Sequence, residues 1–198
     1  MKWFRILLNE DNKIWRKYII FREMFSCNNN EIEICKNIEL KDYNTLNNLI
    51  IHALDHNGKI VNDQKLYEKQ ILPNFAMINN LLLIKDEVYK NIIFESTNEM
   101  KTFIIKLAGK FENNYQLMCF ENIIDCVDSK KSIRKEFETF SKMVLDKRKI
   151  PKNINGFFLS GWDWYGQYEN IVNESLKENL LKLNKSSEFL NFKEIKFE

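Results

Sequence analysis

The stretch YQLMCFENIIDCVDSKKS, Tyr115–Ser132, indicates the fold class of this chain most directly. Its first part is an apolar run that predicts a long strand or a bent pair of strands. Two acids three residues apart, Asp125 and Asp128, follow this run, and Ser132 stands four residues further on. The spacing fits either the edge of an active site or the polar end of a strand, and by itself it leaves both interpretations open.

The composition around this stretch is that of a globular protein. Hydrophobic residues make up 44% of the 198 residues and aromatic residues 13%, enough for the core of one sizeable domain or two small ones. The chain has 30 basic and 28 acidic side chains, for a net charge of +2. A charge so close to zero produces no global field that would attract nucleic acid.

The spacing of the cysteines and the lack of long apolar stretches indicate the cellular compartment of the protein. The 4 cysteines show no CxxC pairing and lie in or beside apolar runs, so we interpret them as reduced structural thiols. No apolar stretch approaches the roughly 18 residues that cross a bilayer, and no cleavage signal follows the first residues. We therefore expect a soluble, cytoplasmic protein with no membrane partner.

Two local patterns near the N-terminus predict secondary structure. Residues 3–9 and 14–21 are β-rich runs on either side of the turn EDNK, which predicts a hairpin. Residues 42–58, DYNTLNNLIIHALDHNG, predict a helix, because their apolar residues recur at helical spacing and form one stripe. Asn-Gly at 57 and 58 would end that helix.

A pattern of apolar and acidic residues repeats at a constant spacing of 88 residues. The matching residues are Leu83, Ile84, Asp86, Val88, Ile92 and Ile93 in the first copy, and Ile171, Val172, Glu174, Leu176, Leu180 and Leu181 in the second. Each copy predicts a strand, a polar cap, a helix and a further strand. We therefore predict an α+β fold, with a mostly antiparallel or mixed sheet and a few covering helices.

A domain boundary is predicted near residues 73–80, where the connecting stretch contains Pro73. It would separate an N-terminal α+β region, residues 1–75, from an α+β domain of residues 76–198. The N-terminal region could equally be part of the same domain.

Three groups of residues are candidates for a metal, nucleic-acid or protein site. His52 and His56 stand four apart on the predicted helix, a spacing that can fill two positions of a zinc site. HALDH lacks the Glu of an HExxH motif and no Cys cluster completes a ligand set, so boundary histidines are favoured. Neither a metal nor a cofactor is expected.

The segment 128–152 is richer in basic than in acidic residues. Such a segment can follow a phosphate backbone, but no recognition helix or aromatic platform accompanies it. A solvated surface of mixed charge is favoured, so nucleic acid is a disfavoured partner. The chain also lacks a GxSxG elbow and a phosphate-binding loop, and no catalytic residue is predicted.

The stretch GWDWYGQY, residues 161–168, is the most unusual local composition. Its candidate partner-binding residues are Trp162, Asp163, Trp164, Tyr165 and Tyr168. Aromatic side chains in a loop supply rigid contact area, as binding surfaces require. The same residues could instead form a loop folded into the core.

The order of motifs over residues 80–198 resembles a family of bacterial immunity proteins that are paired with secreted polymorphic toxins, first noted in a myxobacterial representative. The first motifs are LLLIKDEVYKNI, residues 81–92, and the Tyr115-led strand that ends D-x-x-D-x-x-x-S at Asp125, Asp128 and Ser132. The later motifs are MVLDKRKIP, NGFFLSG, IVNESLKENLLKL and FKEI, which begin at residues 143, 155, 171 and 192. Asn173 stands where the family often has Ser or Thr, and it can still cap a helix.

This resemblance implies a non-catalytic protein that binds a cognate toxin domain and occludes it. It also favours a structural interpretation, in which Asp125 and Asp128 close the strand and Asp128-Ser129 or Ser132 hydrogen-bonds to nearby backbone amides. The alternative from the residues alone is a nucleic-acid-binding protein or metal-dependent enzyme that uses the 128–152 segment or His52 and His56.

Overall fold

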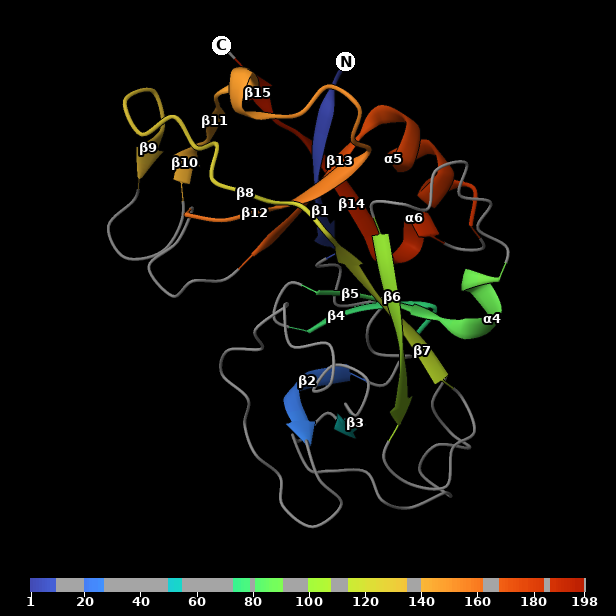
Figure 1. The fold of residues 1–198 in the computed structure, drawn as a ribbon. Helices are drawn as coiled ribbons and strands as arrows, with labels where there is room; N and C mark the ends of the chain where they lie inside the picture. The colour runs from blue at the N-terminus through green and yellow to red at the C-terminus, as the bar shows by residue number, and fades with distance from the viewer. Residues whose placement is uncertain are drawn as a thin grey trace.

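In its described residues, the computed structural model of the chain has two larger β-sheets, two short two-stranded ladders and a few short helices (Figure 1). It describes residues 1–9, 20–26, 50–54, 73–78, 81–90, 100–107, 114–134, 140–161, 168–183 and 186–197. Most neighbouring strands run antiparallel and a few pair in parallel. The predicted α+β class with a mostly antiparallel or mixed sheet is therefore confirmed.

The larger sheet has six strands in the order β2-β3-β6-β7-β5-β4. Their bounds are β2 Ile20–Ser26, β3 Ile50–Leu54, β4 Phe75–Ile78, β5 Leu81–Lys85, β6 Met100–Leu107 and β7 Asn114–Phe120. Only β3 and β6 pair in parallel. The edge strands β2 and β4 also contact each other, so this sheet curves back on itself.

The second sheet has five strands in the order β14-β1-β13-β12-β8. Their bounds are β1 Trp3–Leu8, β8 Ile123–Ile124, β12 Gly156–Leu159, β13 Glu169–Asn173 and β14 Leu190–Glu194. Two small ladders lie near its upper end in Figure 1, β9 Ile133–Arg134 with β10 Phe140–Lys142, and β11 Val144–Leu145 with β15 Lys196–Phe197. The helices within the described residues are α4 Asp86–Tyr89, α5 Glu174–Leu181 and α6 Ser186–Phe189, with a 3-10 turn, η2 Lys147–Lys149.

Strand β1 joins two hydrophobic cores, because its side chains alternate between the faces of the five-stranded sheet. Phe4 and Ile6 belong to the main core, which also holds buried residues of β5 and β7. Trp3 belongs to a smaller core on the other face, where its ring lies 5.4 Å from that of Phe157 in an edge-on arrangement. The first strand of the chain is therefore central to the packing of strands from its last third.

The predicted repeat corresponds to two copies of one four-stranded unit. The order β4-β5-β7-β6 in one sheet matches β12-β13-β1-β14 in the other, and every neighbouring pair in both units is antiparallel. Helix α4 follows β5 as α5 follows β13, and Val88 and Leu176 are buried at equivalent positions. The strand–helix–strand arrangement predicted for both copies is confirmed.

The two units differ in the origin of one strand. In the first unit the inserted strand is β7, which follows β6 directly in the chain. In the second unit the equivalent position is filled by β1, from the opposite end of the chain. The backbone amide of Ile195 donates to the carbonyl of Trp3 at 2.9 Å, so the two ends of the described chain meet at this place.

One predicted element is wrong. Residues Ile50–Leu54, expected in the middle of a helix over 42–58, form strand β3 between β2 and β6. β-branched Ile50 and Ile51 suit a strand, and pairing on both edges outweighs a helical spacing of apolar residues. Of the expected hairpin, the turn and most of the second run, residues 10–19, lie outside the described residues, and the described strand β1 pairs with β13 and β14.

The predicted boundary between residues 75 and 76 stays a prediction. It falls within β4, Phe75–Ile78, and β1 from the N-terminal region is paired with β13 and β14.

Candidate functional site

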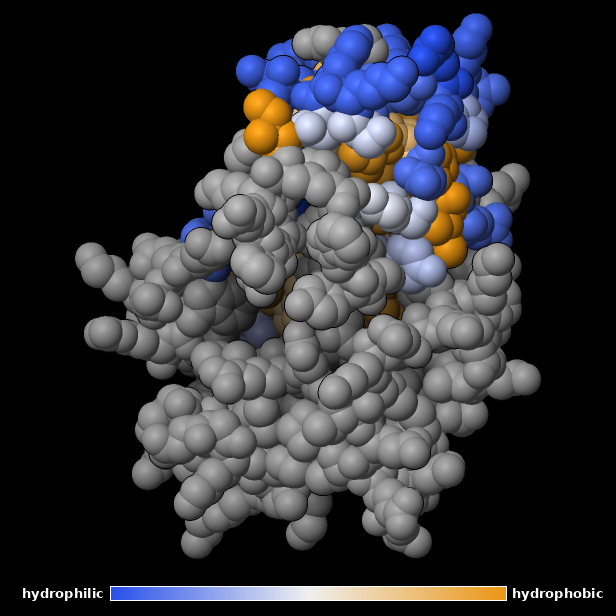
Figure 2. Space-filling view, turned by 90° about the vertical axis from the view of Figure 1, so that its left-hand side faces the viewer, coloured by the Kyte–Doolittle hydropathy of each residue, from blue (hydrophilic) through white to orange (hydrophobic). Residues whose placement is uncertain are grey.

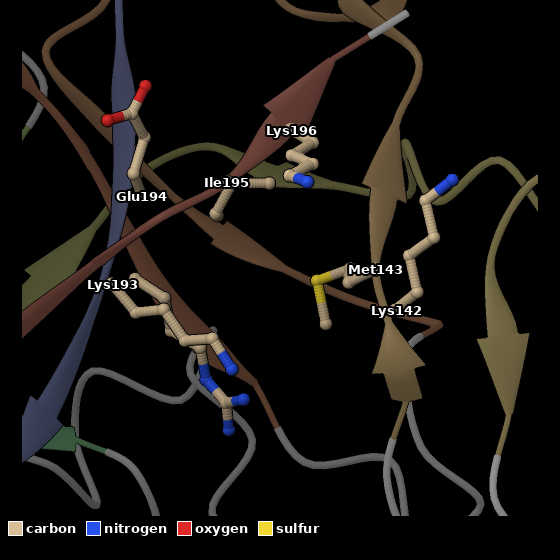
Figure 3. A pocket seen from close by; sticks show the side chains of 7 residues that line it. Lys142, Met143, Lys193, Glu194, Ile195 and Lys196 are labelled. Carbon is tan, nitrogen blue, oxygen red and sulfur yellow. The ribbon is translucent and has the colours of Figure 1, made fainter.

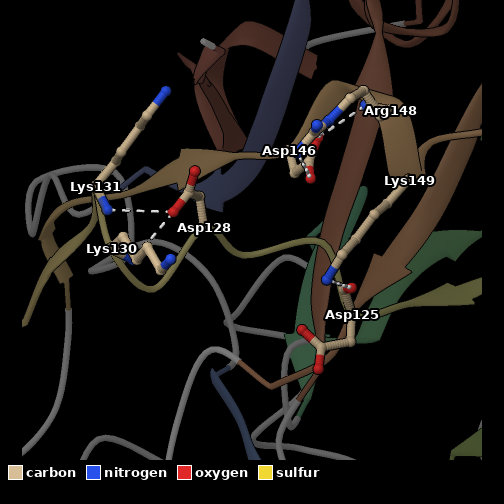
Figure 4. Close-up of polar contacts among 7 residues, drawn as sticks. All are labelled: Asp125, Asp128, Lys130, Lys131, Asp146, Arg148 and Lys149. Carbon is tan, nitrogen blue, oxygen red and sulfur yellow. Dashed lines mark hydrogen bonds and ion pairs between the residues drawn. The ribbon is translucent and has the colours of Figure 1, made fainter.

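The acids of the opening motif lie in separate places around the turn after β8 (Figure 4). In that view Asp125, Asp128 and Asp146 each face their own contacts rather than one another. The segment itself is held by an isolated antiparallel bridge from Val127 to Leu145. The spacing of Asp125 and Asp128 therefore does not bring their carboxylates together, and Asp146, from outside the motif, lies apart from both.

Asp128 closes a turn. Its Oδ1 accepts hydrogen bonds from the backbone amides of Lys130 at 3.0 Å and Lys131 at 3.2 Å. Its own amide donates to the carbonyl of Val144 at 2.9 Å, and its carbonyl accepts from the amide of Ser132 at 2.9 Å. These contacts are those of an Asx turn, in which a carboxylate replaces water on exposed backbone amides.

Ser132 ties the same turn to β11. Its Oγ accepts from the amide of Val144 at 3.0 Å and donates to the carbonyl of Val144 at 3.2 Å. The backbone amide and carbonyl of buried Val144 thus both hydrogen-bond to the hydroxyl of Ser132. Asp128 and Ser132 act together on Val144.

Asp125 is exposed and has a different environment. Its backbone carbonyl accepts from Lys149 Nζ at 3.1 Å, while its carboxylate lies against Gly161. Gly161 has φ +71°, and a Cβ there would lie 2.9 Å from Asp125 Oδ1. Gly161 is therefore required both by its backbone conformation and by the approach of this carboxylate.

Asp146 caps the 3-10 turn η2 and pairs with Arg148. Its Oδ1 accepts from the amide of Arg148 at 3.0 Å, and the guanidinium contacts both carboxylate oxygens at 2.9 Å. The hydrogen bonds from Arg148, first from its side chain and then from its backbone, lower the pKa of Asp146 to about 2. Two cations of the basic segment, Arg148 and Lys149, are thus engaged locally.

Other motif residues also stabilise the fold. Tyr115 is fully buried and its hydroxyl donates to the carbonyl of Pro73 at 2.5 Å, and burial raises the pKa of this phenol above its ordinary range. Asn173 caps α5, since its Oδ1 accepts from the amide of Leu176 at 2.9 Å. Its Nδ2 donates to Asn155 Oδ1 at 2.8 Å.

The aromatic candidates are described only in part. Trp162, Asp163, Trp164 and Tyr165 lie outside the described residues. Tyr168 is half-buried, and its ring centroid lies 5.8 Å from that of buried Phe158. At this one position the stretch packs on the main core.

The histidine and cysteine candidates are likewise described in part. His52 lies on β3, so the helical geometry expected for it is wrong, and His56 lies outside the described residues. Within the described ranges, no three His, Cys, Asp or Glu side chains gather as a metal site would require. Cys119 and Cys126 are buried free thiols, and burial raises the pKa of each to about 12.

A pocket beside the five-stranded sheet was not predicted from the sequence (Figure 3). It has a volume of about 190 Å³ and lies where β14 and β15 meet the junction of β10 and β11. Its lining residues are Arg5, Lys142, Met143, Lys193, Glu194, Ile195 and Lys196. The lysines are exposed, Met143 is half-buried and Ile195 is buried, so a cationic rim surrounds an apolar floor.

Arg5 anchors this pocket to a buried carboxylate. Its Nε donates to Glu169 Oε2 at 2.5 Å, and its second guanidinium contact is to Glu169 Oε1. The Glu169 side chain is 1% exposed and that of Arg5 is 23% exposed. Because an unpaired charge at that depth would be strongly unfavourable, the bidentate pair fixes the side chain of Arg5.

The surface near the pocket is hydrophilic. In the face shown in Figure 2, hydrophilic residues gather at the top of the molecule, the end that carries β9, β11 and β15 in Figure 1, with a few hydrophobic residues between them. Sequence reasoning missed the pocket because its cations come from four segments. The one available signal was Lys142 within the basic segment 128–152.

Comparisons with known proteins add no relative. A scan against models of protein families finds no match, and a search of curated proteins finds none either. No helix of the described part of the chain is long and apolar enough to cross a membrane.

Proposed function

We propose that this chain is an immunity protein that binds the toxin domain of a bacterial polymorphic-toxin system and neutralises it by occlusion, without catalysis. The proposal rests on the order of motifs between residues 80 and 198, which resembles that family of immunity proteins. Such a protein requires a rigid scaffold and a complementary surface, and it transforms nothing itself.

The observation that carries the proposal is the role of the motif side chains. Asp128 and Ser132 hold one turn, Tyr115 anchors β7 to Pro73, and Asn173 caps α5. In an enzyme family, motif residues are expected to meet at a reacting group. Here they make separate contacts that maintain the fold, which fits a family defined by its scaffold, while the partner-facing surface is free to vary with the toxin.

The need to protect the cell also determines how tightly this chain must bind the toxin. A dissociation constant of about 1 nM, roughly 12 kcal/mol of binding free energy, keeps a toxin occupied at cellular concentrations. A small set of well-placed side chains can supply most of that free energy.

The test is co-expression with the protein encoded by the adjacent upstream gene. We expect that this neighbour arrests growth when expressed alone, and that the present chain restores growth and co-purifies with an inactivated form of it. Isothermal titration with the inactivated neighbour then gives the affinity. A toxic neighbour that is neither bound nor neutralised would contradict the proposal.

A further inference from the structure

The cationic pocket carries an excess of unmatched positive charge. The side-chain ammonium groups of Lys142, Lys193 and Lys196 make no ion pair or hydrogen bond in the described part of the chain. The acids near them are already matched, because Glu194 pairs with Lys2 at 3.3 Å and Glu169 pairs with Arg5. Figure 3 also shows the carboxylate of Glu194 pointing away from Lys193 and Lys196.

This arrangement has a cost in stability. In the β1–β14 ladder Lys193 stands directly opposite Arg5. Like charges at facing positions of an antiparallel pair are destabilising. Local features that oppose stability are typical of functional surfaces, where a ligand supplies the missing interaction.

The size and floor of the pocket restrict what can enter. Its volume of about 190 Å³ is below the roughly 300–1,000 Å³ of sites for cofactors and other small molecules. Met143 and Ile195 give it an apolar floor. An occupant with a short apolar stem and an anionic head would place the stem on these residues and the head among the lysines. Apolar walls also strengthen the attraction by focusing the field.

A protein carboxylate fits these features better than a phosphate backbone. The guanidinium of Arg5 is the group in this lining that is suited to bidentate hydrogen bonds with a phosphate. It already makes such a pair with Glu169. A nucleic acid would also require a track of cations over several phosphates, whereas this pocket admits a single group.

We infer that the pocket receives an aspartate or glutamate side chain from an acidic segment of the toxin domain, an inference that rests on the proposed function. Lys193 and Lys196, from β14 and β15, contact the carboxylate, and Lys142 closes the site from β10. The ion pairs form in a partly desolvated site, so they contribute to affinity as well as to the rate of association.

The experiment measures the dissociation constant for the inactivated toxin domain by isothermal titration. We expect Lys193→Glu to weaken binding at least about tenfold, and Lys193→Glu with Lys196→Glu at least about a hundredfold. The matched control is Lys152→Glu with Lys182→Glu, which changes net charge equally at exposed positions outside the pocket. We expect the control to change affinity less than about threefold.

Three outcomes separate the inference from the proposed function. If the toxin binds tightly and neither the pocket variants nor the control variant changes its affinity, the proposed role of the pocket is contradicted. The proposed immunity function is then unaffected. A wild-type chain that does not bind the toxin overturns both. Binding of a 20-nucleotide single-stranded RNA that the pocket variants abolish would identify the occupant as phosphate and overturn the carboxylate. Restoration of affinity between Lys193→Glu and a toxin variant whose acid is replaced by lysine would support the inference.

Discussion

At the scale of single residues, the two acids of the opening motif have different environments although they lie three positions apart. Asp128 accepts two backbone hydrogen bonds through its side chain, whereas the described contact of Asp125 to Lys149 uses its backbone carbonyl. A spacing in the sequence does not distinguish these cases, because the difference arises from the direction in which the chain turns after each residue. The polar end of the strand and the backbone hydrogen bonds of Asp128 or Ser132 could be predicted, but not the separate environment of Asp125.

The first prediction follows from that difference. Asp128→Ala removes an acceptor for two amides, and we expect it to lower the free energy of unfolding by about 1 kcal/mol, the usual effect of a lost side-chain cap. Asp125→Ala is the matched control, with an expected change below about 0.5 kcal/mol. Urea unfolding followed by circular dichroism measures both. Equal losses in the two variants would contradict the assignment.

The second prediction concerns pH. The folded-state pKa of Asp146 is about 2, below its ordinary 3.8, so its pairing with Arg148 stabilises the fold at neutral pH and is lost as pH falls through about 2. Arg148→Ala removes the largest cause of this shift and should raise the Asp146 pKa towards 3.8, although the bond from the backbone amide remains. Carboxyl carbon NMR over pH 1.5–6 measures the titration. An unchanged midpoint in the variant would rule out the guanidinium as the cause.

At the scale of secondary-structure elements, the copies at a spacing of 88 residues were predictable and strand β3 was not. Each copy has a local signal, a strand followed by a polar cap and a helix, that needs no knowledge of distant residues. For Ile50–Leu54 the periodic apolar residues indicated a helix, but β2 and β6 pair with both edges of this segment. Tertiary pairing of that kind is invisible in a local window.

The third prediction tests the cap of α5. Asn173 is 3% exposed, and its Oδ1 and Nδ2 both hold partners. We expect Asn173→Ala to cost about 2 kcal/mol of unfolding free energy, through the lost cap and the lost hydrogen bond to Asn155. Asn173→Ser keeps a cap acceptor and should lose only about half as much. Thermal unfolding of both variants decides the point, and a serine variant as unstable as the alanine variant would contradict a capping role.

At the scale of the whole molecule, the binding surface was the least predictable part. The pocket combines Arg5 of β1 with lysines of β10, β14 and β15. Its formation depends on β1 lying beside β14, a pairing of the first strand with one near the C-terminus. Local patterns of strands and helices predicted the fold class, but no local pattern could predict which distant cations would meet.

The fourth prediction concerns β1. Deleting residues 1–9 leaves β13 and β14 without their common neighbour and removes Trp3, Phe4 and Ile6 from two cores. We expect the truncated chain to lose cooperative thermal unfolding, and an added peptide of residues 1–9 to restore it. The control is a peptide with Phe4→Ser and Ile6→Ser, which should not restore it. Cooperative unfolding of the truncated chain without peptide would show that residues 10–198 fold independently.

The position of β1 also bears on the order of events during translation. The first repeat can close as soon as β7 is made, but β1 emerges from the ribosome long before either of its neighbours, β13 and β14. At about 5–20 residues per second, the interval between Leu8 and Glu169 lasts roughly 8 to 32 s. During that time WFRILL is a largely apolar segment of a nascent chain without its native strand partners, and such unpaired strands are prone to pair with other exposed strands.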